Sequence, residues 1–148
     1  MKKSLPIGSL KVTASSRGVT AVTPGSRKRS RSQTSLERRC ERELQEYFAG
    51  TREHFTVPLD LQGTTFQKSV WEALRSVPHG TTLTYGQLAR KIGSPRAVRA
   101  VASAVARNPI GVIIPCHRII PLHGSQPGNF AWGKKRKVWL IKHEQKGD

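Results

Sequence analysis

The sequence predicts a mainly α-helical fold with short strands, built around a helix-turn-helix. Apolar residues recur at the three- and four-residue spacing of a helix face in four segments, residues 36–48, 65–77, 84–107 and 134–145. Gly93-Ser94-Pro95 interrupts the third of these segments with turn-forming residues. Two shorter apolar stretches, residues 55–59 and 110–120, are typical of extended chain instead. Helices should therefore dominate, and the strands should be short.

The composition points to a single soluble domain with a polyanionic partner. A chain of 148 residues can bury a real core, and its formal net charge is +17. Residues 1–40 hold ten Lys or Arg against the single acid Glu37, and the remainder is still strongly basic. Nucleic acid is the expected partner, with an anionic membrane surface as the weaker alternative. No apolar run approaches the length of a membrane span, and the two cysteines suggest no disulfide framework.

Residues 1–35 are predicted to be a disordered basic arm. They are rich in Ser, Thr, Gly, Lys and Arg, show no apolar periodicity and include the run Arg27-Lys28-Arg29-Ser30-Arg31. Such an arm would add non-specific attraction to phosphates. A transit or nuclear address is the alternative, although no amphipathic period supports it.

Residues 36–64 are predicted to be a helix and a linker. One helix face carries the apolar side chains Leu36, Cys40, Leu44, Tyr47 and Phe48. Ser35 is the expected N-cap, and Gly50 is expected to end the helix. Cys40 lies on the core side of this helix, so we assign it no chemistry.

The helix-turn-helix is predicted within residues 84–107. After a helix over residues 65–77, Thr84 can cap a short helix that reaches Ile92. The second helix is expected to begin with Pro95 at its first position and to end at Arg107, before Asn108-Pro109.

The second of these helices has two different faces. Val98, Val101 and Val105 form an apolar stripe. Another stripe carries the polar residues Arg96, Arg99, Ser103 and Arg107, and alanines fill the remaining positions. Small side chains would let the backbone approach a DNA groove, which favours DNA contact. The alternative is an ordinary amphipathic surface helix, because alanine is simply a good helix former.

The apolar run 110–120 contains Pro115-Cys116-His117-Arg118, which predicts a buried turn with a reactive thiol. A small buried cysteine in a core strand is the alternative. Glu144 shares a helix face with Leu140 and Ile141, and a carboxylate on an apolar face needs a partner such as histidine. Thiol, imidazole and carboxylate can act as nucleophile, base and orienting group. Adjacent side chains diverge, so a water is expected between His117 and Cys116.

Residues 65–144 resemble the O6-alkylguanine-DNA alkyltransferase family, also called the methylated-DNA-protein-cysteine methyltransferases. The matching stretches are Phe66 to Trp71, Thr84 to Ala89, Ala97 to Val101, Asn108-Pro109, Ile114 to Ile120, Trp139-Leu140 and His143-Glu144. Pro-Cys-His-Arg with Asn-Pro upstream is a specific signature. The resemblance implies a winged-helix-like helix-turn-helix alkyltransferase domain over residues 65–148.

The resemblance also implies a reaction without turnover. The thiolate of Cys116 would attack the alkyl carbon on O6 of guanine in DNA, and O4-alkylthymine would be a second substrate. His117 would take the thiol proton through a water, and Glu144 would hold and polarise the imidazole. Tyr85 matches the tyrosine that donates to guanine N3 and helps to turn the nucleotide outward. Neither a cofactor nor a metal is expected.

Contact with alkylated double-stranded DNA is implied through the minor groove, by a monomer. A stacked guanine must be flipped out of the duplex before a buried sulfur can reach it. Arg99 matches the arginine that fills the vacated space, and Asn108 matches the residue that holds the nucleophile's turn. Further DNA contacts are implied for Arg96, Ser94, Ser103 and Arg118. The implied substrate pocket consists of Ile119, Phe130, Ala131 and Trp132.

The chain departs from the family pattern in two ways. The usual N-terminal domain is expected to be mostly missing, with residues 36–64 as its remnant. Trp132 stands where the family often has a small residue, which should disfavour large alkyl groups. A regulatory protein that binds alkylated DNA without repairing it is the alternative function, and the presence of Cys116 argues against it. The expected location is cytoplasmic if the source is bacterial and nuclear if it is eukaryotic.

Overall fold

The computed structural model describes residues 5–26, 32–122 and 130–146, and it divides the chain into two compact units. Unit 1 comprises Met1–Gln62 with Pro109–Gly111. Unit 2 comprises Gly63–Asn108 with Val112–Asp148. None of the helices in the described ranges is long and apolar enough to cross a membrane.

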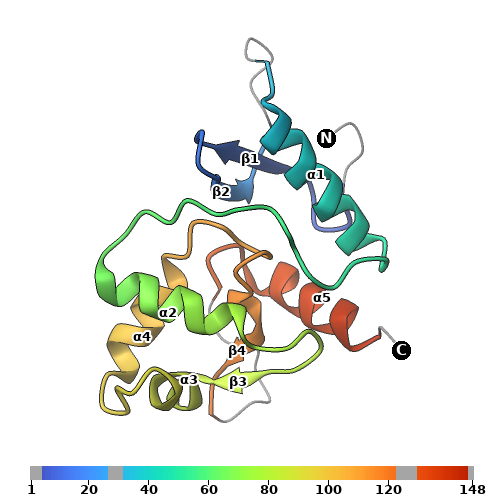
Figure 1. Ribbon diagram of the computed structural model, residues 1–148. Helices are drawn as coiled ribbons and strands as arrows, with labels where there is room; N and C mark the ends of the chain where they lie inside the picture. The colour runs from blue at the N-terminus through green and yellow to red at the C-terminus, as the bar shows by residue number, and fades with distance from the viewer. Residues whose placement is uncertain (1–4, 27–31, 123–129, 147–148) are drawn as a thin grey trace. The chain divides into compact units, whose positions relative to one another are not determined.

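Unit 1 is a β-hairpin packed against one helix (Figure 1). Strands β1 (Leu10–Ala14) and β2 (Val19–Pro24) pair antiparallel, and α1 spans Ser35–Phe48. The side chains that fill the core of this unit include Leu10, Val12, Val19, Val22, Cys40, Leu44 and Tyr47. Thr34, rather than Ser35, caps α1, and it forms a capping box with Glu37. Glu37 also accepts a hydrogen bond from the backbone of Ala14 in β1, which ties the helix to the hairpin.

The prediction of a disordered arm over residues 1–35 is wrong for the part that the structure describes. Residues 10–24 form the two strands, and Ser15 and Gly18 close the turn between them through a backbone hydrogen bond of 2.8 Å. Each strand is too short to show a clear apolar period, and the hairpin packs its apolar side chains against α1, which is distant in sequence. The basic run of residues 27–31 lies outside the described residues.

Unit 2 is mainly helical, as predicted. Its elements are α2 (Thr65–Arg75), β3 (Leu83–Thr84), α3 (Tyr85–Lys91), α4 (Val98–Ala106), the 3-10 helix η1 (Cys116–Arg118), β4 (Ile119–Ile120) and α5 (Lys134–Gln145). Strands β3 and β4 pair in parallel beside α3 (Figure 1). Helices α2 and α4 are joined in the core, where the indole of Trp71 donates to the carbonyl oxygen of Ala104 at 2.8 Å. Capping boxes at Thr64 and Thr84 begin α2 and α3.

The helix-turn-helix is present, but its second helix begins at Val98 instead of Pro95. Gly93, with φ of 79°, ends the preceding helix in the left-handed conformation that favours glycine. The backbone of Ala97 then donates to Ser94 at 2.9 Å, which closes a separate turn around Pro95. Pro95 fits the first helical position and also this turn, and the sequence pattern alone favoured the helix.

Candidate active site

Cys116 begins η1, at the end of a buried turn. Its side chain is 7% exposed, and the backbone N–H of Cys116 donates to Ile114 at 2.8 Å. Upstream, Val112 has φ of 69°, which a β-branched residue adopts only at a cost of about 1–3 kcal/mol. Asn108, just after α4, donates its Nδ2 to the carbonyl oxygen of Ile114 at 2.8 Å. The turn that carries the thiol is thus fixed to the end of the helix-turn-helix.

His117 and Glu144 form the pair that the sequence predicts. Nε2 of His117 lies 2.7 Å from Oε2 of Glu144, and both side chains are buried. Burial would raise the pKa of Glu144, but hydrogen bonds from His117 and Arg118 hold it well below its ordinary value. Burial lowers the pKa of His117, against the opposing effect of Glu144. A neutral His117 must donate from Nε2 to this carboxylate, so Nδ1 keeps its lone pair.

Nδ1 of His117 is buried and has no hydrogen-bond partner within the described structure. An unpaired ring nitrogen in a buried site is uncommon. It is the atom that would accept a proton if His117 acts as a base.

Arg118 does not lie where the sequence analysis expects it. Its guanidinium is buried, donating Nε and Nη2 to the two oxygens of Glu144 at 2.8 and 2.9 Å. Nη1 donates to the carbonyl oxygen of Val77 at 2.6 Å. The expected contact with DNA differs from this arrangement, in which the fork-shaped donor set of Arg118 is used inside unit 2.

The two cysteines have opposite electrostatic surroundings. Burial raises the pKa of the Cys116 thiol to about 11, while a hydrogen bond with Asn108, the charge of Lys137 and nearby backbone N–H groups act to lower it. Burial, together with the neighbouring carboxylates Glu43 and Glu41, raises the pKa of Cys40 to about 12. Only Cys116 therefore has groups around it that favour a thiolate.

Lys137 is a site residue that the sequence analysis missed. It is completely buried on α5, and burial lowers its pKa to about 8 against the opposing effect of Cys116. Lysine is usually exposed, so its type suggested a surface position. Its spacing gave the signal, since Lys137 lies three residues before Leu140 and seven before Glu144, on the same helix face.

Tyr85 and Ile119 come from neighbouring elements of unit 2. Tyr85, the first residue of α3, is half-buried, and burial raises its pKa, with a further contribution from Cys116. Its hydroxyl therefore keeps its proton at neutral pH. Ile119 is buried in β4, directly after η1.

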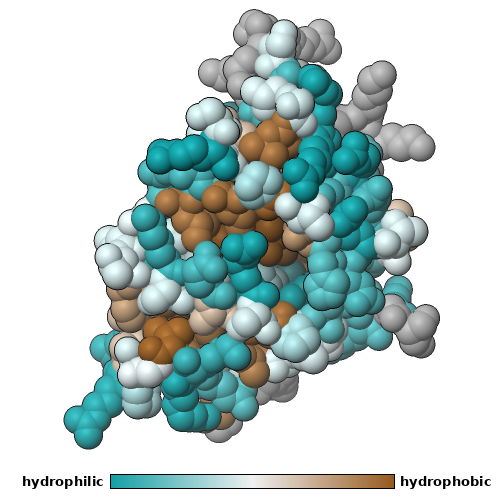
Figure 2. Space-filling view, viewed as in Figure 1, coloured by the Kyte–Doolittle hydropathy of each residue, from teal (hydrophilic) through white to brown (hydrophobic). Residues whose placement is uncertain are grey.

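The predicted polar stripe of α4 and the turn before it lies on the surface. Its exposed residues are Arg96, Arg99, Ser103 and Arg107, and Ser94 is half-buried. Ala100 and Ala106 are exposed between them, whereas Val101 and Val105 are buried. Over the region where α3 and α4 are drawn, the space-filling view shows hydrophilic side chains with a small apolar patch (Figure 2). Val98 was expected in the apolar stripe and is instead 37% exposed.

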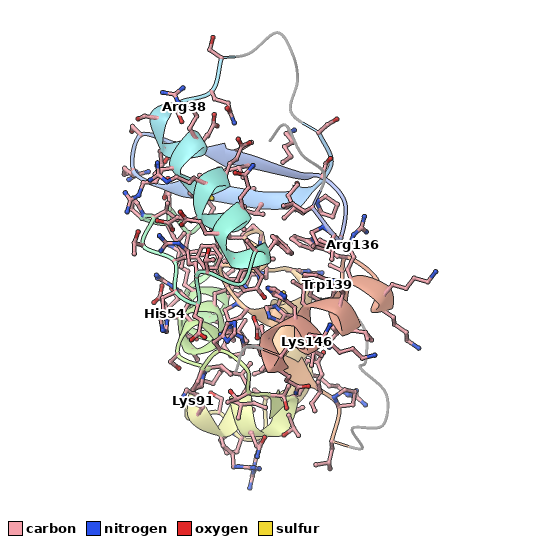
Figure 3. All side chains as sticks on the ribbon, turned by 90° about the vertical axis from the view of Figure 1, so that its right-hand side faces the viewer. Arg38, His54, Lys91, Arg136, Trp139 and Lys146 are labelled. Atoms are coloured by element: carbon pink, nitrogen blue, oxygen red, sulfur yellow. The ribbon has the colours of Figure 1, made fainter. Side chains whose placement is uncertain are left out.

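The expected pocket loop is described only from Phe130 onward. The rings of Phe130 and Trp132 are tilted against each other with centroids 5.8 Å apart, and Ala131 is exposed. Arg136 on α5, labelled in Figure 3, donates to the carbonyl oxygen of Trp132 at 3.0 Å. This hydrogen bond fixes the end of the loop to the first turn of α5. Within the described residues, no group of three or more His, Cys, Asp or Glu side chains could hold a metal ion.

Family models match both parts of the chain. Residues 65–146 match the 6-O-methylguanine DNA methyltransferase, DNA binding domain. Residues 3–61 match the ribonuclease-like domain of the same family. The second match corrects the expectation that the N-terminal domain is mostly missing.

Known proteins and solved structures agree with these matches. A methylated-DNA–protein-cysteine methyltransferase of Methanosarcina acetivorans is 50% identical over 107 residues, which cover 72% of this chain and 68% of that protein. OGT of Mycobacterium tuberculosis, solved in complex with DNA, has a TM-score of 0.85 at 35% identity over 98% of this chain and 91% of its own. Atl1 of S. pombe, solved with damaged DNA containing O6-carboxymethylguanine, has a TM-score of 0.50 at 27% identity, over 56% and 78% of the two chains.

A buried Cys-His-Glu site, in which the histidine and the glutamate are hydrogen-bonded, lies beside a helix-turn-helix and defines a DNA-binding protein with a nucleophilic thiol. The chain belongs to the 6-O-methylguanine DNA methyltransferase family, whose members are DNA repair enzymes that transfer an alkyl group to a cysteine.

Proposed function

We propose that this protein repairs O6-alkylguanine in double-stranded DNA by one irreversible alkyl transfer to Cys116. The observation that carries the proposal is the arrangement of His117 beside this thiol, with Glu144 at 2.7 Å from Nε2 and a buried, unpaired Nδ1. The surroundings of Cys40 instead oppose a thiolate. O4-alkylthymine is a second proposed substrate.

The transfer balances without any oxidant or reductant. Sγ of Cys116 forms a bond to the alkyl carbon while the bond from that carbon to O6 breaks, and its electron pair stays on the guanine. The thiol proton passes through a water to Nδ1 of His117, and Glu144 stabilises the imidazolium that forms. The guanine takes up a proton at N3 from Tyr85, whose raised pKa keeps its hydroxyl protonated until then. The imidazolium then returns its proton through solvent to Tyr85, and the proton on guanine N3 is exchanged with water for one on N1, so the products are a thioether and an unmodified guanine.

The substrate nucleotide has to leave the duplex before this chemistry begins. We propose that α4 enters the minor groove, where the small exposed Ala100 and Ala106 permit close approach. Arg99 then occupies the space left by the flipped nucleotide, and Arg96, Ser94, Ser103 and Arg107 contact the DNA backbone. Asn108 keeps the thiol in register with this helix through its hydrogen bond to Ile114. The proposed functional state is a monomer.

The size of the alkyl group is proposed to be limited by the pocket loop. The indole of Trp132 lies against Phe130. We place both of these large rings where the alkyl group would be held. Methyl should therefore be transferred faster than benzyl.

A single-turnover assay tests the proposal. Excess duplex DNA with a labelled methyl group at O6-methylguanine should transfer one equivalent of label to each protein molecule and then stop. The Cys116→Ser variant should bind the same duplex and take up no label. Binding by the unsubstituted chain without transfer would show a recognition protein instead, and continued turnover would exclude a permanent acceptor.

A further inference from the structure

Arg118 is the strongest unexplained feature of the site, because the proposed reaction gives it no task. We propose that Arg118 is a positioning residue that keeps His117 neutral, by engaging both oxygens of Glu144 and balancing the carboxylate's charge. This inference rests on the proposed role of His117 as the base. A base that already carries a proton cannot take one from Cys116, so this balance would determine whether the site can act at neutral pH.

The geometry around Glu144 leaves each carboxylate oxygen with two donors. Oε2 accepts from Nε2 of His117 at 2.7 Å and from Nη2 of Arg118 at 2.9 Å. Oε1 accepts from Nε of Arg118 at 2.8 Å and from the backbone N–H of Gly80 at 3.4 Å. A carboxylate has about four acceptor positions, so this one is fully engaged. The bidentate contact and the bond from Nη1 to Val77 fix the guanidinium in one place.

Charge balance explains why the guanidinium matters for His117. A buried carboxylate bonded only to an imidazole would favour the imidazolium, because opposite charges at hydrogen-bond distance stabilise each other. Arg118 already supplies the positive charge that Glu144 needs. Cys116, His117, Arg118 and Glu144 together form a buried cluster. A second cation, on His117, would leave this cluster with a net positive charge, which burial disfavours.

The neighbouring charged groups act in the same direction. Both Arg118 and Lys137 lower the pKa of His117, in addition to the larger effect of burial. The other titratable groups of the neighbouring elements are Lys137 on α5, Cys116 on the 3-10 helix that also holds His117, and His79 in the turn that contains Gly80. A proton moving from Cys116 to His117 leaves the net charge of the cluster unchanged. The cluster therefore resists a proton from solvent more than a proton from the thiol.

The test measures the protonation of His117 directly, in the full chain without DNA. Nitrogen NMR of labelled histidine should show His117 neutral, with the proton on Nε2, at pH 7 and below the ordinary histidine pKa of about 6.5. In Arg118→Met the same ring should be imidazolium at pH 7. Transfer from the free alkylated base should then need a pH at least about one unit higher, equivalent to about a fivefold loss at the pH where the unsubstituted protein is half active and about a tenfold loss well below it.

Two further variants separate charge from structure. Arg118→Lys keeps a cation beside Glu144 but loses the fork, so His117 should stay neutral and the pH profile should stay close to that of the unsubstituted chain. Arg75→Met removes an exposed arginine of α2 and should change neither measurement. If Arg118→Met does not fold, Arg118→Gln, which keeps N–H donors for Glu144 but carries no charge, replaces it with the same expected imidazolium at pH 7.

Three results would overturn the proposal. They are an imidazolium at His117 in the unsubstituted protein at pH 7, a neutral His117 in Arg118→Met, and a loss of rate by the same factor at every pH. Because the NMR titration needs no alkyl transfer, a failure of the proposed repair function would be seen separately, as absence of transfer with the titration unchanged.

Discussion

At Glu144, burial and hydrogen bonding act on one carboxylate in opposite directions. Burial alone would favour the neutral acid, yet three donors from His117 and Arg118 keep it ionised. The sequence could predict that this carboxylate is buried and paired with a histidine, because Leu140 and Ile141 share its helix face. It could not predict Arg118 as the second partner, since arginine in a basic DNA-binding protein suggests the surface. Lys137 was missed for the same reason.

Glu144→Gln should destabilise the protein in a pH-dependent way. The folded pKa of Glu144 lies below its ordinary 4.5, so the ionised group stabilises the fold above about pH 4.5, and this contribution is lost as the pH falls further. At pH 7 the variant leaves Arg118 without its anion and should lose about 3–5 kcal/mol in urea unfolding. Glu72→Gln, at an exposed ion pair, should lose at most about 1 kcal/mol. A difference that stays constant from neutral to acidic pH would contradict this assignment.

Lys137→Met should slow alkyl transfer mainly below pH 8. The ammonium of Lys137 lowers the pKa of Cys116, and its own pKa of about 8 means that this charge disappears above that pH. We expect a loss on the order of tenfold at pH 7, for a change of about one unit in the thiol pKa. The ratio of the two rates should approach one at higher pH. Lys142→Met, exposed on the same helix, is the control, and an equal effect there would indicate general loss of charge.

At the scale of elements, the caps and the apolar faces predicted the helices of unit 2 well. Thr64 and Thr84 begin α2 and α3 because each combines a side-chain cap with a glutamine three residues later. The start of α4 was missed because the turn around Pro95 depends on one backbone hydrogen bond that no composition shows. The polar stripe of α4 was still placed correctly, since a helical face depends on spacing more than on the first residue.

Arg99→Ala should separate nucleotide flipping from chemistry. Arg99 is exposed on α4, away from the buried thiol, so its loss should leave the fold intact. Flipping costs a few kcal/mol, part of which a side chain in the vacated space offsets. Repair of duplex DNA should slow much more than transfer from the free alkylated base. Arg107→Ala, farther along the same stripe, should mainly reduce the salt dependence of binding, by a slope of about 0.9 for one phosphate contact. Equal slowing of both substrates by Arg99→Ala would contradict the flipping role.

At the scale of the whole molecule, the N-terminal part is a folded unit with its own core. Composition suggested an arm because the strands within residues 10–24 are short and rich in threonine, and serines lie in the turn between them. Their apolar residues become a pattern only beside the buried face of α1, and that long-range pairing is not visible along the chain. The high charge correctly indicated a nucleic-acid partner, because net charge needs no knowledge of the fold.

Deleting residues 1–34 should unfold unit 1 rather than only weaken DNA binding. The deletion removes both strands and the Thr34 cap, and it uncovers the side of α1 that holds Cys40, Leu44 and Tyr47. In a Cys116→Ser background, a thiol reagent should not react with Cys40 in the full chain, where this thiol is fully buried and its pKa is raised to about 12. The truncated chain should react quickly. Equal protection of Cys40 in both chains would restore the view of residues 1–34 as a separate arm.

Peptide mapping by mass spectrometry after repair of an O6-methylguanine duplex tests the central claim most directly. The account predicts one added methyl group, a mass increase of one methylene unit, on the peptide that contains Cys116. Cys40→Ser should acquire the same modification at the same rate, and Cys116→Ser should acquire none. A methyl group on Cys40, or transfer that survives Cys116→Ser, would contradict the assignment of the acceptor.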